Sequence, residues 1–328
     1  MAGPNPLPPR PDAVAGASGL MLLHDDVAAA RGWQTAAVRP KRPTPLMAVA
    51  SAGVMFLTGC RSATAVAPCP PSAFQRSKML VIAHAGGEGL GPANTLEAMR
   101  RSMSAGADVN DADVHITADG ILVAIHDDTV DATTDGKGLV RDKTLAELQA
   151  LDAGWSFAGP ANDFPFRGRG VRIPTVEQVL IEFPDTLTSL EFKDESGPAP
   201  QVMCSLLRRL GRTGSVYMSS RTDPAVEEFK ALCPEVATTV TDALVPVMRA
   251  AQASGEAWCS PVPIGQPPYR EEHKPTSASL RWSHDHGLAS FTWTIDDPDT
   301  IRYLASIGMD GVYTRRPDIA RAIVDEAH

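Results

Sequence analysis

The stretch Met79–Ala105, MLVIAHAGGEGLGPANTLEAMRRSMSA, contains the pattern from which the fold can be predicted. It begins with an apolar run of strand length, Met79–Ala83, and continues through a glycine-rich connection. It ends in residues whose apolar side chains have helical spacing, after a possible N-cap at Thr95. A buried strand followed by a helix is the repeating unit of proteins with parallel sheets.

The same alternation continues to the C-terminus. Strands are predicted over Met79–Ala83, Val109–Thr117, Ile121–Ile125, Leu187–Lys193, Ser215–Ser219, Val236–Thr241, Ala257–Val262, Ser290–Ile295 and Gly311–Thr314. Helices are predicted over Leu96–Ala105, Thr144–Leu151, Thr175–Phe183, Val202–Leu210, Pro224–Leu232, Thr276–His286, Pro298–Gly308 and Asp318–Glu326.

This pattern and its length predict a (β/α)8 TIM barrel. The strand-like runs outnumber the eight strands of a barrel, so one of them is expected to be a hairpin arm. A doubly wound open sheet is the second candidate, but the chain has no glycine-rich dinucleotide turn. Residues 127–174 form a long connection with one helix, and a loop of that length is usually functional.

The composition limits the class of partner. The 328-residue chain is 43% hydrophobic, which is enough for a large core, and carries a formal net charge of −9. An acidic protein gains nothing from counterion release on a polyanion, so nucleic acid is excluded as a general partner.

The first 59 residues are predicted to be a signal or leader segment. A basic run, Arg39–Arg42, precedes the apolar stretch Leu46–Leu57, which is too short to span a bilayer. The stretch ends in Leu-Thr-Gly-Cys at residues 57–60, which resembles a bacterial lipobox. A plain signal peptide, or a buried helix with a chance cysteine, is the alternative.

The lipobox interpretation divides the chain into three parts. Cys60 would carry lipid, residues 60–78 would form a flexible tether, and the barrel would occupy 79–328. The protein would then be exported and held on the outer face of the cytoplasmic membrane. An exported chain can form disulfides, but Cys204, Cys233 and Cys259 are odd in number, with Cys69 in the tether, so no pairing is predicted.

Polar side chains gather where the predicted strands end. They are His84, Asp111 and Asp113, His126, and Glu191 with Lys193. The members of each pair lie two apart on a strand, so both face the same side. Taken singly, each is more often structural: a satisfied histidine, a solvated carboxylate pair or a surface ion pair.

Together these residues indicate phosphodiester hydrolysis. Buried carboxylates repel one another unless a cation lies between them, and three oxygen donors suit Ca²⁺ or Mg²⁺. Two histidines beside the cation can act as general base and general acid. Lys193 can neutralise charge on a phosphoryl oxygen, and no serine or cysteine nucleophile is evident.

Several segments in order resemble the glycerophosphodiester phosphodiesterase family over about residues 79–325. They are 81–87 (VIAHAGG), 91–96 (GPANTL), 105–120 (AGADVNDADVHITADG), 125–136 (IHDDTVDATTDG), 173–175 (IPT), 190–193 (LEFK), 293–296 (WTID) and 311–318 (GVYTRRPD). The ordered set is far more specific than any one motif.

The resemblance implies a role for each matching residue. His84 and His126 would be the acid–base pair, and Lys193 would hold the phosphate. Asp111, Asp113 and Glu191 would be the metal ligands, and Asn94 and Trp293 would bind substrate. His115 shares the face of the two aspartates and is interpreted as a supporting residue.

Three positions depart from the family pattern. Ala85 replaces an arginine, which removes one phosphate contact, and Ala93 replaces a glutamate. Asp111 replaces a glutamate and keeps the ligand type. Arg141, Arg167 or Arg169 from the long connection could supply the lost positive charge.

The first functional hypothesis is metal-dependent hydrolysis of glycerophosphodiesters to sn-glycerol 3-phosphate and an alcohol. A lysophospholipase D or phosphoinositide-type activity on the same barrel is a related alternative. A hypothesis of another class is a surface lipoprotein that binds phosphodiesters or envelope polymers and has lost catalysis. Ala85 and Ala93 favour it, and the retained histidines and carboxylates oppose it.

Overall fold

The computed structural model describes residues 68–194, 197–220 and 222–327. The predicted leader and Cys60 therefore lie outside the described residues. The strands are β1 (Leu80–Ala83), β2 (Val109–Ile116), β3 (Leu122–Ala124), β4 (Leu187–Phe192), β5 (Val216–Ser220), β6 (Ala237–Thr238), β7 (Ile264–Gly265), β8 (Ala289–Thr292) and β9 (Gly311–Thr314).

These strands form a closed parallel barrel. Hydrogen-bonded neighbours follow the order β6-β5-β4-β2-β1-β9-β8-β7, and every neighbouring pair in this order is parallel. A parallel bridge between Thr239 and Ile264 joins the two ends of the order. Strand β3 pairs antiparallel with β2 and is the expected hairpin arm. The predicted TIM barrel is confirmed, and the open doubly wound sheet is excluded.

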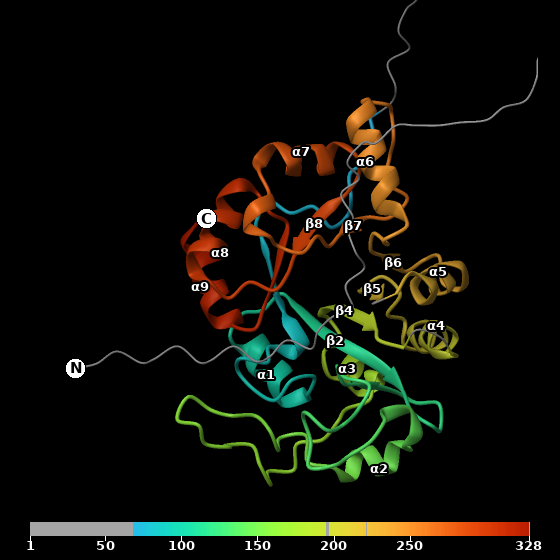
Figure 1. The fold of residues 1–328 in the computed structure, drawn as a ribbon, viewed down its shortest axis with the longest axis vertical. Helices are drawn as coiled ribbons and strands as arrows, with labels where there is room; N and C mark the ends of the chain where they lie inside the picture. Colours follow the sequence, from blue (N-terminus) through green and yellow to red (C-terminus); the bar gives the residue numbers. More distant parts are fainter. Residues whose placement is uncertain (1–67, 195–196, 221, 328) are drawn as a thin grey trace, which may run out of the picture. The chain divides into compact units, whose positions relative to one another are not determined.

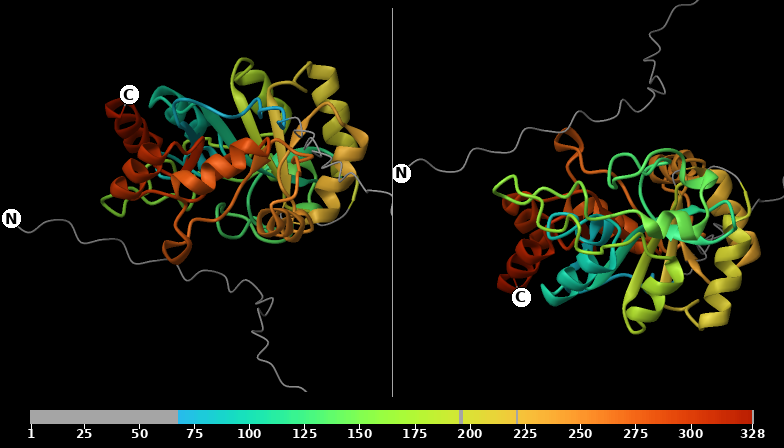
Figure 2. Two further views of the ribbon diagram at one scale, coloured as in Figure 1. Left: turned by 90° about the horizontal axis from the view of Figure 1, so that it is seen from above. Right: turned by 90° about the horizontal axis from the view of Figure 1, so that it is seen from below.

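Helices surround the barrel (Figure 1). They are α1 (Leu96–Ser104), α2 (Leu145–Ala150), α3 (Val176–Glu182), α4 (Ala199–Leu210), α5 (Asp223–Leu232), α6 (Leu244–Ser254), α7 (Ser277–Asp285), α8 (Pro298–Ile307) and α9 (Pro317–Glu326). Short 3-10 turns occur at η1 (His84–Gly86), η2 (Val140–Asp142) and η3 (Glu271–His273). In both views of Figure 2 the red helices α8 and α9 lie at the opposite end of the domain from α4 and α5.

Two predictions about the second half of the barrel are wrong. The strand expected over Ala257–Val262 is absent, and the short strand β7 begins at Ile264. Cys259 is in a disulfide, and Pro261 and Pro263 cannot donate to a sheet ladder. Helix α6 was not predicted because it contains Pro246, which a first helical turn tolerates since its N–H would have no partner there.

Apolar side chains fill both sides of the barrel wall. The interior contains Ile82, Val109, Tyr217, Phe291 and Tyr313, and Phe74 packs edge-on against Tyr217 at 5.8 Å between ring centroids. The largest outer cluster lies between the β2–β4–β5 wall and helices α3, α4 and α5. These two layers fix the strands and therefore the side chains at their ends.

Residues 68–78, predicted as the last part of a tether, are bound to the barrel. Cys69 forms a disulfide with Cys259, and the Ser72 hydroxyl donates to the Pro263 carbonyl at 2.7 Å. The Arg76 N–H donates to buried Asp310 at 2.9 Å. Pro263 and Asp310 directly precede β7 and β9, so this segment closes the N-terminal end of the barrel.

Candidate active site

The loop after β1 presents His84 at the C-terminal end of the barrel. The chain turns sharply there, with Ala85, Gly86 and Gly87 all at positive φ. A Cβ on Gly87 would lie 1.9 Å from the Ser102 hydroxyl, so this turn requires glycine. The imidazole Nδ1 of His84 lies 3.4 Å from the Glu88 carboxylate.

The charges around His84 favour its protonated form. Burial alone would lower the pKa of His84, but the Glu88 carboxylate and the nearby Asp111 and Asp113 raise that pKa to about 9. A cation bound among the aspartates would offset their charge and move the pKa back toward its ordinary value.

Strand β2 carries the two aspartates on its inward face, as predicted. Both are buried, and the Ala85 N–H donates to Asp111 at 3.0 Å. Burial and the neighbouring Asp113 raise the pKa of Asp111 to about 6. Burial would also raise the pKa of Asp113, but the Lys193 ammonium and the histidines lower it below its usual range. The pKa values of the two neighbouring carboxyl groups are therefore shifted in opposite directions.

Asn94 orients Asp113. Its side-chain amide donates to the Asp113 carboxylate at 2.7 Å and accepts the Asp113 N–H at 2.9 Å. The residue is buried in the left-handed conformation at φ 57°, which asparagine tolerates better than most residues. Asn94 was expected to bind substrate, and in the structure both ends of its amide contact the aspartate.

Lys193 bridges two carboxylates at the end of β4. Its Nζ lies 3.0 Å from Asp113 and 3.0 Å from Glu191. The register of β2 and β4 places Asp113 beside Glu191. Burial would lower the pKa of Lys193, but the two carboxylates raise it, so the ammonium stays charged. Asp113, Glu191 and Lys193, which were predicted to belong to one site, therefore lie in contact.

His126 follows the hairpin arm β3 and faces solvent. Its side chain is 54% exposed, and its Nδ1 lies 2.7 Å from Asp127. Buried His115 supports this loop: its Nδ1 lies 2.8 Å from Asp194, and its Nε2 lies 3.3 Å from the His126 carbonyl. The interpretation of His115 as a supporting residue agrees with these contacts.

Trp293, directly after β8, is exposed at the same end of the barrel. Its indole N–H donates to the Gln266 carbonyl at 2.9 Å. The Gln266 amide in turn donates to the Tyr313 hydroxyl, which contacts Ser189 at 3.1 Å. Within residues 68–194, 197–220 and 222–327, no hydrogen bond joins Trp293 to the histidines or carboxylates of the site. The polar chain through the barrel interior links it to the strand that carries Glu191.

Sequence reasoning missed several groups that shape the site. They are Glu88 beside His84, Asp194 beside His115, and the hydroxyl cluster of Ser189, Tyr217 and Tyr313 beneath Asp111. Only the hydroxyl cluster could have been found from the sequence. Ser189 lies two residues from both Leu187 and Glu191, so the three side chains share one face of β4. The other two lie in loops and have no periodic position.

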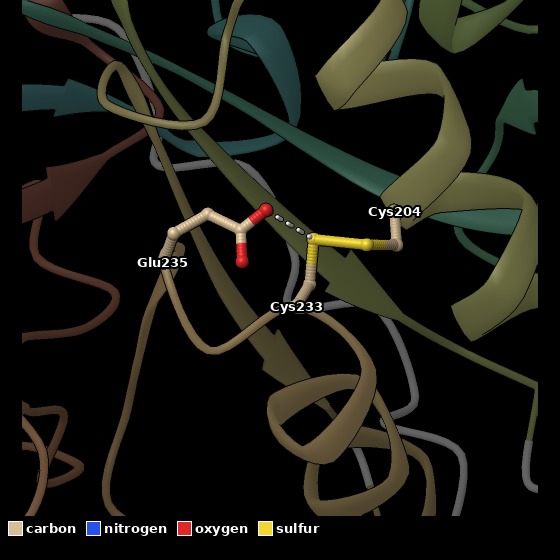
Figure 3. Close-up of side chains that lie close together, drawn as sticks. All are labelled: Cys204, Cys233 and Glu235. Carbon is tan, nitrogen blue, oxygen red and sulfur yellow. Dashed lines mark hydrogen bonds between the residues drawn. A yellow bond between two sulfur atoms is a disulfide. The ribbon is translucent and has the colours of Figure 1, made fainter.

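A different cluster has metal-ligand spacing but is not a metal site. Within the described ranges, the one group of three such side chains with ligand atoms within 4.8 Å of one another is Cys204, Cys233 and Glu235. Cys204 and Cys233 are joined in a disulfide that ties α4 to the end of α5, as Figure 3 shows. The carboxylate oxygens of Asp111, Asp113 and Glu191 do not all lie within 4.8 Å of one another. The Lys193 ammonium contacts both Asp113 and Glu191.

The barrel and its polar end define the class of protein. Active sites of TIM barrels lie at the C-terminal ends of the strands and draw residues from several strands. Here β1, β2 and β4 supply a histidine, two aspartates, a glutamate and a lysine to that end. The chain therefore has the architecture of a (β/α)8 enzyme.

Comparison with known proteins identifies the family. The model of the glycerophosphoryl diester phosphodiesterase family matches residues 84–319. Bacillus subtilis YhdW is 33% identical over 246 residues, covering 73% of this chain and 96% of its own. A glycerophosphodiester phosphodiesterase of Caldanaerobacter subterraneus subsp. tengcongensis is 32% identical, covering 74% of this chain and 96% of its own.

A solved structure gives the same result. The glycerophosphodiester phosphodiesterase of Agrobacterium tumefaciens superimposes with a TM-score of 0.63 at 25% identity, covering 74% of this chain and 99% of its own. The chain belongs to the glycerophosphoryl diester phosphodiesterase family and is an enzyme. The family resemblance carried by the motifs is confirmed.

Proposed function

We propose that this protein hydrolyses glycerophosphodiesters to sn-glycerol 3-phosphate and an alcohol in a cation-dependent reaction. The observation that carries the proposal is the convergence of His84, Asp111, Asp113, Glu191 and Lys193 at one end of the barrel. The family match and the names of the relatives support the substrate class.

The donor chemistry of the site fits a hard divalent cation such as Ca²⁺ or Mg²⁺. Asp111, Asp113 and Glu191 offer only oxygen, which these cations prefer. Asp111 and Asp113 are both buried, and burial together with the neighbouring Asp113 carboxylate raises the pKa of Asp111 to about 6. When bound there, the cation would supply Lewis-acid polarisation of the phosphodiester.

The side chains of the protein would bind the substrate and move protons. One histidine would remove a proton from water or from a glycerol hydroxyl, and the other would protonate the leaving alcohol. The Lys193 ammonium would stabilise charge on a phosphoryl oxygen. Exposed Trp293 would contact the glycerol end of the substrate, which the resemblance implies.

A comparison of substrates would test the proposal against its close alternatives. The protein should release glycerol 3-phosphate from glycerophosphocholine faster than it releases choline from lysophosphatidylcholine. Coupled assays of the two products, with equal protein and cation, would measure this. Preference for the lysolipid would favour the lysophospholipase D-like activity. Binding without turnover of either would favour the non-catalytic lipoprotein.

We also propose that Cys60 is lipidated and holds the protein at the outer face of the membrane. The lipobox-like residues 57–60 motivate this, and within the described residues no helix is long and apolar enough to cross a bilayer. Cys60 is nine residues before Cys69, and nine residues span at most roughly 30 Å. The disulfide at Cys69 would therefore keep the N-terminal end of the barrel near the membrane.

This orientation favours a water-soluble substrate, because the candidate active site lies at the other end of the barrel. We expect the Cys60→Ser protein to leave the membrane fraction, since without acylation the tether has no hydrophobic anchor. Fractionation with a salt wash, followed by immunoblotting, would measure this. If the Cys60→Ser protein still pellets with membranes as the unchanged protein does, the lipid-anchor proposal is wrong.

A further inference from the structure

Among the described residues gathered at the candidate active site, Lys193 and His84 already have carboxylate partners. The Lys193 ammonium already contacts two carboxylates at 3.0 Å each, and His84 is paired with Glu88. Exposed Asp127 and Asp128 add negative charge beside His126. A substrate that carries a phosphate anion therefore needs a further donor. The inference below rests on the proposed function.

Arg315 lies beside the His84 loop. It is the first residue after β9, and the β1–β9 register pairs Ala83 with Thr314. The next residues, His84 and Arg315, thus leave two adjacent strands at the same end of the barrel. The Gly89 N–H donates to the Arg315 carbonyl at 3.0 Å, which joins Arg315 to the loop that carries His84 and Glu88.

The guanidinium of Arg315 is held along one edge only. Asp296 accepts the Arg315 backbone N–H at 2.8 Å and also the side-chain Nε–H. Its two terminal nitrogens have no hydrogen-bond partner among the described residues, and the side chain is 54% exposed. A fixed guanidinium with two free N–H₂ groups matches the geometry of phosphate oxygens.

Two other arginines are already engaged. Arg316 makes two hydrogen bonds to Asp318, at 2.9 and 2.7 Å. Arg167, one candidate from the long connection, stacks between Trp155 and Phe164, with its guanidinium 4.2 and 3.7 Å from the ring centroids. Its Nε–H also donates to the Trp155 carbonyl at 2.9 Å. These contacts leave less of either guanidinium for a ligand.

We propose that Arg315 binds the phosphate oxygens of the substrate. It would supply from the end of β9 the positive charge that Ala85 cannot supply from the loop after β1. The relevant ligand class is an organic phosphate mono- or diester.

Substitution at Arg315 tests this directly. We expect Arg315→Ala to weaken binding of glycerol 3-phosphate roughly tenfold to a hundredfold, the usual scale for a hydrogen bond to a charged group. Calorimetry at fixed Mg²⁺ would measure the dissociation constant. The KM for glycerophosphocholine should rise by a similar factor. The affinity of Arg315→Lys should lie between those of the unchanged protein and Arg315→Ala. Lysine keeps the positive charge but lacks the paired N–H donors of the guanidinium.

Arg302 on α8 provides a matched control. It is 55% exposed and pairs with Asp299 at 2.8 Å, and it lies on helix α8, outside the barrel. Arg302→Ala should bind glycerol 3-phosphate as the unchanged protein does. Introducing Ala85→Arg into the Arg315→Ala protein should restore part of the lost affinity, and a merely structural role for Arg315 would not give this rescue.

The possible outcomes separate this inference from the proposed function. If the unchanged protein binds glycerol 3-phosphate and Arg315→Ala binds it equally well, with an unchanged melting temperature, Arg315 is not a phosphate ligand. If the unchanged protein neither binds glycerol 3-phosphate nor turns over glycerophosphocholine, both fail. If Arg315→Ala loses affinity without losing its fold, and Arg302→Ala does not, the inference stands.

Discussion

Replacing His84 or His126 by alanine is expected to lower kcat for glycerophosphocholine at least about a hundredfold, the usual scale for a general acid or base. The two losses should not add in the double variant, because both side chains would serve one transition state. Steady-state release of glycerol 3-phosphate measures both effects. His84 is additionally paired with Glu88 at 3.4 Å, so its replacement also removes that ion pair.

His286→Ala is a suitable control for these variants. His286 is half-buried and stacks on Trp282 at 4.1 Å between ring centroids, just before β8 at the N-terminal end of the barrel. We expect this variant to keep its kcat. A folded His84→Ala protein with unchanged kcat would exclude His84 from proton transfer. Histidine variants that change only ligand affinity, in a protein without turnover, would favour the binding lipoprotein.

Asp113→Asn is expected to weaken cation binding at least about a hundredfold. Loss of residues that merely orient a metal ligand costs about ten- to a hundredfold, and loss of a charged ligand should cost no less. The variant keeps the shape of the side chain and an oxygen for Asn94, but it removes the charge that faces Lys193. Titration of the cation against restored activity would measure the affinity.

Asp299→Asn tests whether the loss of a carboxylate elsewhere on the protein also weakens cation binding. Asp299 is on α8, 92% exposed and paired with Arg302. Its replacement should leave the cation titration unchanged. Equal cation affinity in Asp113→Asn and the unchanged protein would contradict the assignment of Asp113 as a ligand. A thermal melt should accompany the titration, since Asp113 is buried and its loss affects Asn94 and Lys193 as well.

Much of the fold was predictable because apolar residues recur at strand or helix spacing between turn residues along most of the barrel. Strands β1, β2, β4 and β9 agree with their predicted ranges to within a residue or two. The two-residue strands β6 and β7 are too short for a pattern, which explains why one was predicted too long and the other in the wrong place. The predicted bounds of α1, α3, α7, α8 and α9 agree with the structure to within one residue at each end.

The inward residues of the site were predictable for the same reason. Period-two spacing placed Asp111 with Asp113, and Glu191 with Lys193, on one side of their strands. Spacing could not reveal that Asn94 contacts Asp113, or that Arg315 and His84 leave neighbouring strands. Those contacts depend on which strands become neighbours when the barrel closes. The attachment of residues 68–78 also depended on a disulfide whose pairing the sequence did not specify.

The most direct test of the account is the release of glycerol 3-phosphate from glycerophosphocholine by the unchanged protein before and after removal of divalent cations. Activity should be lost in excess chelator and restored by Ca²⁺ or Mg²⁺, because Asp111, Asp113 and Glu191 would then lack the cation they are proposed to hold. Full turnover in excess chelator would contradict the three-carboxylate site. No release of glycerol 3-phosphate under any cation condition, by folded protein, would contradict the proposed hydrolysis itself.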